Sequence, residues 1–195
     1  ALPGLTALLF APVAGFEATN YDDPNYVFAN PPVLQGWSWE GLRWAFATNH
    51  AANWHPLTWL SHMTDIELFG PNPGPQHVVN LAFHCANTAL LFLLLCRLTG
   101  AFWRSALVAA LFAWHPLRVE SVAWISERKD VLSGMFGLLS FYAYGRHAKS
   151  LAVGNHTTGL VCWPSRWYWA TLVCFALGLL SKPMLVTLPF VLLLL

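Results

Sequence analysis

The chain has 195 residues, of which 56% are hydrophobic and only 10% carry a charge. About a quarter of the residues are charged in an ordinary soluble domain, so this composition indicates a protein embedded in a membrane. The formal net charge is only +1, which leaves no basic surface to match the phosphate backbone of nucleic acid. We therefore expect membrane lipid, and not nucleic acid, as a partner.

Apolar segments that approach the length of a membrane span recur along the chain. A span needs about 20 apolar residues, and fewer where interfacial residues complete it. We predict six spans: Leu2–Phe16, Val78–Leu95, Phe102–Trp114, Val131–Tyr144, Trp167–Leu180 and Met184–Leu195. The sequence thus predicts an all-α integral membrane protein with about six transmembrane helices. A tight turn at Ser181–Pro183 is expected to separate the last two spans.

The segment between the first two predicted spans, residues 17–77, is far longer than a simple connection. Ser38 is suited to cap a helix over Trp39–Thr48, and Pro56 is suited to the first turn of a second helix over Leu57–Phe69. Both predicted helices are amphipathic and rich in aromatic residues, as in helices that lie on a membrane surface. We therefore expect a long outer loop that carries interfacial helices.

Charge divides the connecting segments into two sets. All nine acidic residues fall in segments 17–77 and 115–130, whereas segments 97–104 and 146–166 contain five basic residues and no acid. Basic loops face the cytoplasm in membrane proteins. The acid-rich side is therefore expected outside the cytoplasmic membrane of a prokaryote, or in the endoplasmic reticulum lumen of a eukaryote.

Two polar segments of the outer loop could carry chemistry. Asp22 and Asp23 are adjacent carboxylates that repel each other, so that one could have a raised pKa and act as a proton acceptor; a solvated turn before Pro24 is the alternative. His55 directly precedes a predicted helix and could bind a metal or a phosphate, or could merely cap the helix. The histidine spacings do not form a helical zinc site, and we assign no metal ligand.

The densest polar segment follows the third predicted span. If it is helical from Arg118 to Lys129, these two cations return to one face, and Glu120 and Glu127 line another. A charge at the centre of a span costs about 2.5–3.5 kcal/mol. We therefore expect this cluster to pair internally, to line a cavity or to meet a charged ligand.

Lys182 stands alone between the last two predicted spans, where it could extend to the membrane surface or bind a lipid phosphate. Together with Arg128 and Lys129 it could neutralise a leaving phosphate while a carboxylate deprotonates an acceptor hydroxyl. The residues alone are thus compatible with transfer from a lipid-linked phosphate donor. A transporter and a non-catalytic membrane anchor are the alternatives.

Five ordered blocks of sequence carry a resemblance to a known family. The blocks are Tyr21–Asp23, Asn53–Met63, His115–Trp124, Glu127–Ser133 and Ser181–Met184. In this order they resemble the N-terminal membrane region of the transmembrane and tetratricopeptide-repeat O-mannosyltransferases and their prokaryotic relatives. The resemblance implies a partial GT-C-like membrane domain over residues 1–195, with its first outer loop at 17–77. It also implies further spans and tetratricopeptide repeats beyond these residues.

The resemblance further implies an inverting glycosyltransferase. It would move a sugar, mannose in the eukaryotic members, from a polyprenyl-phosphate carrier to a Ser or Thr hydroxyl of a protein acceptor on the outer face. Asp22 and Asp23 match the acidic motif of the family, with one of them as general base. We assign the donor phosphate to Arg128, Lys129, Lys182, Arg118, His55 and His115, and supporting roles to Glu120, Glu127 and Asp130. Arg118 stands where many relatives have His. The lipid-linked sugar is a substrate rather than a cofactor, and a divalent metal stays an open alternative.

Overall fold

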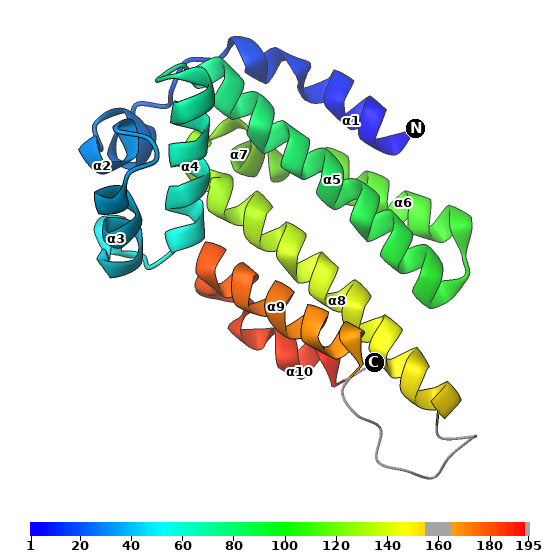
Figure 1. Cartoon of the computed structure of the whole chain (residues 1–195). Helices are drawn as coiled ribbons and strands as arrows, with labels where there is room; N and C mark the ends of the chain where they lie inside the picture. Colours follow the sequence, from blue (N-terminus) through cyan, green and yellow to red (C-terminus); the bar gives the residue numbers. More distant parts are fainter. Residues whose placement is uncertain (155–164, 194–195) are drawn as a thin grey trace.

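The computed structural model describes residues 1–154 and 165–193, whose regular secondary structure is entirely helical, with no strand (Figure 1). In chain order the elements are α1 (Leu2–Phe10), η1 (Ala11–Gly15), η2 (Pro24–Phe28), α2 (Pro31–Leu34), α3 (Trp39–Ala47), η3 (His50–Ala52), α4 (Pro56–Phe69), α5 (Pro73–Thr99), α6 (Phe102–Trp114), α7 (Arg118–Ala123), η4 (Ile125–Glu127), α8 (Arg128–Gly154), α9 (Arg166–Ser181), η5 (Pro183–Thr187) and α10 (Leu188–Leu192). The predicted all-α class is confirmed.

Four of the six predicted spans lie within single helices. They fall in α5, α6, α8 and α9, and the prediction of Phe102–Trp114 matches both ends of α6. Among the described residues, however, only α5 is long and apolar enough to cross a membrane; α6, Leu2–Gly15 and Pro183–Leu192 are apolar but shorter. One membrane-spanning helix is therefore supported, and six are not confirmed.

The first and last predicted spans are interrupted near a proline. Within Leu2–Phe16, α1 gives way to the 3₁₀-helix η1, which contains Pro12. Within Met184–Leu195, the 3₁₀-helix η5 precedes a short α10 that contains Pro189, and residues 194–195 lie outside the described range. A proline has no N–H to donate to the carbonyl one turn earlier, so an α-helix that continued through Pro12 or Pro189 would lose a hydrogen bond there.

The long helices form a bundle in which α8 lies between α5 and α9, while α1 and α6 pack against α5 (Figure 1). The short elements α2–α4 and α7 gather at the end where α5 and α8 begin and where α9 finishes. All nine acidic residues lie at this end: six on α3, α4, α7, η4 and the first turn of α8, and three in the connection between η1 and η2. The basic residues Arg97, Arg104, Arg146, Lys149 and Arg166 lie at or near the other ends of the long helices.

The outer loop folds around its own apolar core. Trp59 and Met63 of α4 are fully buried against residues of η2, α2 and α3. The predicted helix starts are confirmed: the Ser38 hydroxyl accepts the Gly41 N–H at 2.9 Å, and Pro56 is the first residue of α4. The helix α4 therefore packs on other elements of the chain, α9 included, instead of lying alone on a surface.

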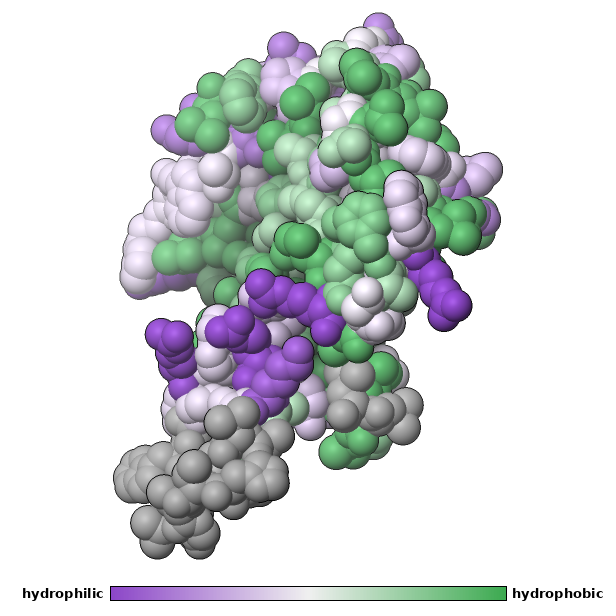
Figure 2. All heavy atoms as spheres, turned by 90° about the vertical axis from the view of Figure 1, so that its right-hand side faces the viewer, coloured by the Kyte–Doolittle hydropathy of each residue, from purple (hydrophilic) through white to green (hydrophobic). Residues whose placement is uncertain are grey.

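Large apolar side chains face outward from the bundle. Trp103 is 82% exposed, and Leu8, Leu107, Leu111 and Phe190 are each more than half exposed. Figure 2 shows a mainly apolar surface above a group of hydrophilic residues. Outward apolar side chains at this density support a membrane environment for these helices.

Candidate functional site

The segment from Arg118 to Lys129, considered above as one possible helix, is divided in the structure, because α7 ends at Ala123 and α8 begins at Arg128. Trp124 is extended (φ −91°, ψ 127°), and a 3₁₀ turn leads from it into α8. Side chains from elsewhere replace the missing helical bonds. Asn80 donates to the Trp124 carbonyl at 2.7 Å, and the Ser126 N–H donates to Asp23 at 2.9 Å. The two ends of the segment consequently do not share one helical face.

The adjacent carboxylates Asp22 and Asp23 have different surroundings. Asp23 is fully buried, and its two oxygens accept N–H groups from Thr19 at 2.8 Å and from Ser126 at 2.9 Å. Asp22 is partly exposed, and within the described residues no hydrogen bond to its carboxylate is formed. Asp23 therefore links the outer loop to the 3₁₀ turn before α8. The carboxylate of Asp22 has no hydrogen-bond partner among the described residues.

Arg128, predicted to hold a phosphate, is fully buried at the start of α8. Its guanidinium donates to Asp65 at 2.6 Å, Ser61 at 2.8 Å, the Gln76 carbonyl at 3.0 Å, and the Asn80 side chain. These acceptors come from α4 and α5, so Arg128 joins three helices. Since its donors are already directed at protein acceptors, we interpret Arg128 as a structural cation.

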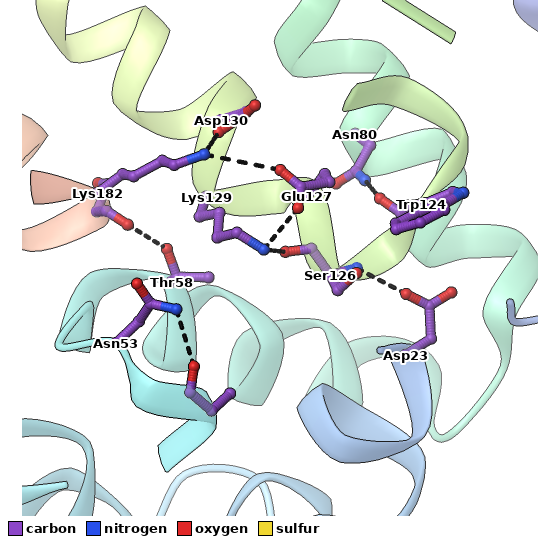
Figure 3. A network of polar contacts seen from close by, with 12 residues as sticks. Asp23, Asn53, Thr58, Asn80, Trp124, Ser126, Glu127, Lys129, Asp130 and Lys182 are labelled. Carbon is purple, nitrogen blue, oxygen red and sulfur yellow. Dashed lines mark hydrogen bonds and ion pairs between the residues drawn. The ribbon is translucent and has the colours of Figure 1, made fainter. Parts of the chain in front are cut away.

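Two lysines and two carboxylates form an ion network beside this joint (Figure 3). The Lys129 ammonium lies 2.7 Å from Glu127 and 3.1 Å from the Ser126 carbonyl. The Lys182 ammonium contacts Asp130 and lies 3.9 Å from the second oxygen of Glu127. Burial raises the pKa of Glu127, an effect that the hydrogen bond from Lys129 opposes. The network links η4, α8 and the residue that follows α9.

A hydrogen bond to the residue before Lys182 fixes the position of the Lys182 backbone. The Thr58 hydroxyl donates to the Ser181 carbonyl at 2.9 Å, which ties α4 to the end of α9. Lys182 itself is extended (φ −159°, ψ 131°), so its side chain leaves the helix at this point. The Lys182 side chain is 23% exposed, against 10% for Lys129 and none for Arg128. Of these three predicted phosphate ligands, Lys182 is the most accessible.

A cavity of about 890 Å³, here called the charged cavity, opens beside Lys182. Its polar lining consists of His115, Arg118, Glu120, Ser121, Glu127, Asp130 and Lys182, and its apolar wall comes from α5 and α6. A second cavity of about 290 Å³, here called the apolar groove, is lined mainly by α5 and α8, with Phe112, Arg118, Ser121 and Leu185 from other elements. Arg118 and Asp130 line both cavities, so the two adjoin.

Arg118 differs from the other cations of the site. Its guanidinium lies 4.5 Å from the centre of the Phe112 ring, and it forms no ion pair within residues 1–154 and 165–193. It is partly exposed and faces both the charged cavity and the apolar groove. Its charge is thus available to an anion without first breaking a salt bridge.

The two predicted histidines lie in contrasting places. His55 is buried in a cluster with Tyr26, on which it stacks at 5.5 Å between ring centres, and Trp59, whose tilted ring lies 4.6 Å away. Burial, with the nearby charge of Lys129, lowers the pKa of His55 to about 4, so the ring is neutral at pH 7. His115 is exposed on the wall of the charged cavity. Only His115 is accessible to a ligand there.

Sequence reasoning missed the polar partners contributed by α5. Asn80, His84 and Asn87 are buried, and their side chains bond to the carbonyls of Trp124, Ala113 and Val131; Gln76, also buried, offers its backbone carbonyl to Arg128. Their spacing of three and four residues places them on one face of the helix. A polar stripe inside an apolar span is the signal that could have identified them. Among the described residues, no three His, Cys, Asp or Glu side chains are arranged to hold a metal ion.

The fold and the site define a helical protein that has one helix long and apolar enough to cross a membrane and a charged cavity next to an apolar groove. Over 185 residues the chain is 31% identical to Protein O-mannosyl-transferase Tmtc2 of Drosophila melanogaster, which covers 89% of this chain. It is 29% identical over 174 residues to Protein O-mannosyl-transferase TMTC2 of Mus musculus and 36% identical over 148 residues to TMTC1 of Homo sapiens, which cover 86% and 69% of this chain. The chain belongs to this family of protein O-mannosyl-transferases.

The match covers only part of each relative. The chain spans 18%, 20% and 16% of the lengths of these three proteins. No family model matches the chain, and no solved structure matches it. Membership of the family therefore rests on sequence relatives that are several times longer than this chain.

Proposed function

We propose that this chain forms the donor-binding part of an inverting membrane glycosyltransferase. The enzyme transfers mannose from a polyprenyl-phosphate carrier to a Ser or Thr hydroxyl of a protein, on the side of the membrane that the acid-rich end faces. That side is the endoplasmic reticulum lumen in a eukaryote or the outside of a prokaryotic cytoplasmic membrane. The names of the relatives support transfer of mannose to protein; the donor class rests on the two cavities.

The observation that carries the proposal is the junction between the charged cavity and the apolar groove. A polyprenyl-phosphate sugar has a polar, anionic head and a long apolar chain. The charged cavity offers polar side chains to the head, and the adjoining groove offers apolar walls to the first isoprene units. A polar metabolite that lacks a lipid tail would leave the apolar groove unfilled.

Arg118 and Lys182 are the proposed ligands of the donor phosphate. Arg118 lines both cavities and has no carboxylate partner within the described residues, so it can bind the anion directly. Lys182 can follow by exchanging its contact with Asp130 for one with the phosphate. Arg128 and Lys129 hold the surrounding elements in place, and His115 adds a polar contact at the rim.

Asp22 is the proposed general base, and Asp23 positions it. In the reaction, the base removes the proton of the acceptor hydroxyl as the hydroxyl oxygen forms a bond to the anomeric carbon of mannose. The bond from that carbon to the phosphate oxygen breaks, and the phosphate leaves with the electron pair. Cations at the phosphate stabilise the charge that develops on it. Asp22 has the unengaged carboxylate that such a base requires.

The test uses the full-length protein in detergent with radiolabelled polyprenyl-phosphate mannose and Ser/Thr peptides. Arg118→Gln removes the proposed phosphate ligand, and Arg43→Gln is the matched control, because Arg43 is exposed on α3 and contacts Trp39. A hydrogen bond to a charged group contributes about 1.5–3 kcal/mol, so Arg118→Gln should weaken donor binding roughly 10- to 100-fold. Arg43→Gln should leave donor binding unchanged.

Donor binding and mannose transfer to peptide are measured separately, so that each possible failure gives a different result. Donor binding without transfer to any peptide would contradict the acceptor class while keeping the donor site. Equal donor binding by the parent and Arg118→Gln would overturn the phosphate site. Neither binding nor transfer would indicate that the donor is wrong, and a non-catalytic anchor would then be the better description.

A further inference from the structure

At the end of the bundle away from the acidic residues, a third cavity opens between α5, α8 and α9. Its volume is about 660 Å³. Arg97 of α5 and Arg146 and Lys149 of α8 provide its cations, Tyr142 and Trp167 its aromatic rings, and Leu94 and Leu98 an apolar wall. We call it the basic cavity. It shares no lining residue with the charged cavity or the apolar groove.

The cations of the basic cavity have no carboxylates near them. In the sequence no acidic residue occurs between Glu67 and Glu120 or after Asp130, and all acids lie at the other end of the bundle. The two arginines lie against aromatic rings instead: the Arg97 guanidinium is 4.7 Å from the Tyr142 ring centre, and that of Arg146 is 4.7 Å from the Trp167 ring centre. The aromatic rings orient the guanidinium groups without neutralising them.

We propose that the basic cavity binds the phosphate headgroup of an anionic membrane lipid. Several uncompensated cations at the end of a membrane helix attract such headgroups, and side chains of Arg suit the geometry of phosphate. Figure 2 shows hydrophilic residues beneath a mainly apolar surface at this end of the molecule. That arrangement lets a lipid keep its chains on the apolar surface while its phosphate meets the cations.

The size and lining of the cavity favour a lipid over a free phosphate ion. Cavities for organic ligands measure about 300–1,000 Å³, a range that includes the basic cavity and far exceeds the needs of one small anion. Leu94, which is buried, and Leu98 would contact the upper part of an acyl chain. Inorganic phosphate would leave this apolar wall unused.

The experiment measures lipid retained by the full-length protein after exchange into micelles that contain phosphatidylglycerol or phosphatidylcholine. Arg146→Gln combined with Lys149→Gln removes two exposed cations of the cavity. Each basic residue near an anionic lipid strengthens binding by about fivefold, so the double variant should bind phosphatidylglycerol roughly 20-fold more weakly. Arg104→Gln is the matched control, because Arg104 is exposed at the same end but lines a different cavity.

A second variant tests the cavity itself without changing its charge. Gly145 lines the cavity, and a Cβ added there would meet only Leu98, at 3.9 Å. Gly145→Leu should therefore fill the space and reduce phosphatidylglycerol retention, whereas Gly145→Ala should not. An equal loss in Arg104→Gln would mean that charge attracts lipid diffusely, and would overturn the site. Displacement of the lipid by millimolar inorganic phosphate would instead identify a site for the free anion.

Discussion

Asp23 and Ser126, 103 residues apart in the chain, are joined by a hydrogen bond of 2.9 Å from the Ser126 N–H to the buried carboxylate. The bond lies where the helical chain is interrupted between α7 and α8. It connects the acidic pair of the outer loop to the residue that precedes Glu127, and so to the ion network around Lys129 and Lys182. The geometry of the acidic pair and that of the charged cavity are thereby coupled.

This coupling predicts different effects for the two acidic residues. Asp23→Asn keeps the shape but loses a charge-assisted acceptor, and hydrogen bonds to charged groups contribute about 1.5–3 kcal/mol. We expect a loss of about 1–3 kcal/mol in the free energy of unfolding together with lower mannosyl transfer. Asp22→Asn should abolish transfer and leave stability unchanged. Thermal unfolding in detergent and the transfer assay measure both effects, and equal stability losses in the two variants would contradict this division of roles.

We predict that Arg128 stabilises the fold and does not bind the donor phosphate. Arg128→Lys retains the charge but cannot reach four acceptors, while Arg128→Met leaves Asp65 buried without a partner. Breaking a buried ion pair in this way costs about 3–5 kcal/mol. We expect both variants to lower the unfolding midpoint strongly, and Arg118→Lys to change it little. A well-folded Arg128→Met variant that lost only donor binding would show that Arg128 acts on the phosphate after all.

Because the pKa of His55 is lowered in the folded protein, we expect the stability of the protein to depend on pH. Its pKa of about 4 in the folded protein lies below the value of about 6.5 in an unfolded chain, so the unfolded state binds more protons between these two values. The contribution of His55 is therefore fully present above pH 6.5 and is lost as the pH falls toward 4. The difference in unfolding midpoint between the parent and His55→Gln should shrink from pH 7.5 to pH 4.5. A constant difference would contradict the neutral, buried state of this ring.

Local patterns were sufficient to predict the helices but not the site. The apolar run of α6 and the capping by Ser38 depend on neighbouring residues, and both predictions are confirmed. The partners of Arg128 and Asp23 come from segments up to 103 residues away. Periodicity carries no information about such pairings. For this reason the sequence suggested that Arg128 binds a ligand. In the structure its guanidinium donates its hydrogen bonds to acceptors of the same chain.

Leu185 is inserted between two glycines of neighbouring helices, and it also lines the apolar groove. A Cβ at Gly178 of α9 would lie 2.3 Å from a methyl carbon of Leu185, and one at Gly137 of α8 would lie 3.2 Å from the other. Gly178→Ala must therefore displace Leu185. Overpacking of this kind typically costs about 1–3 kcal/mol, and the displaced side chain should also alter donor binding in the groove.

The clash can be isolated with a second substitution. In a Leu185→Ala background the methyl carbons are absent, so Gly178→Ala should cost about 1 kcal/mol less than it does alone. Gly4→Ala on α1 is the control, because nothing lies within 4 Å of a Cβ at that position. Unfolding midpoints of the four variants measure the coupling. If the cost of Gly178→Ala is the same in both backgrounds, Leu185 does not pack against this glycine and does not form the wall of the groove as described.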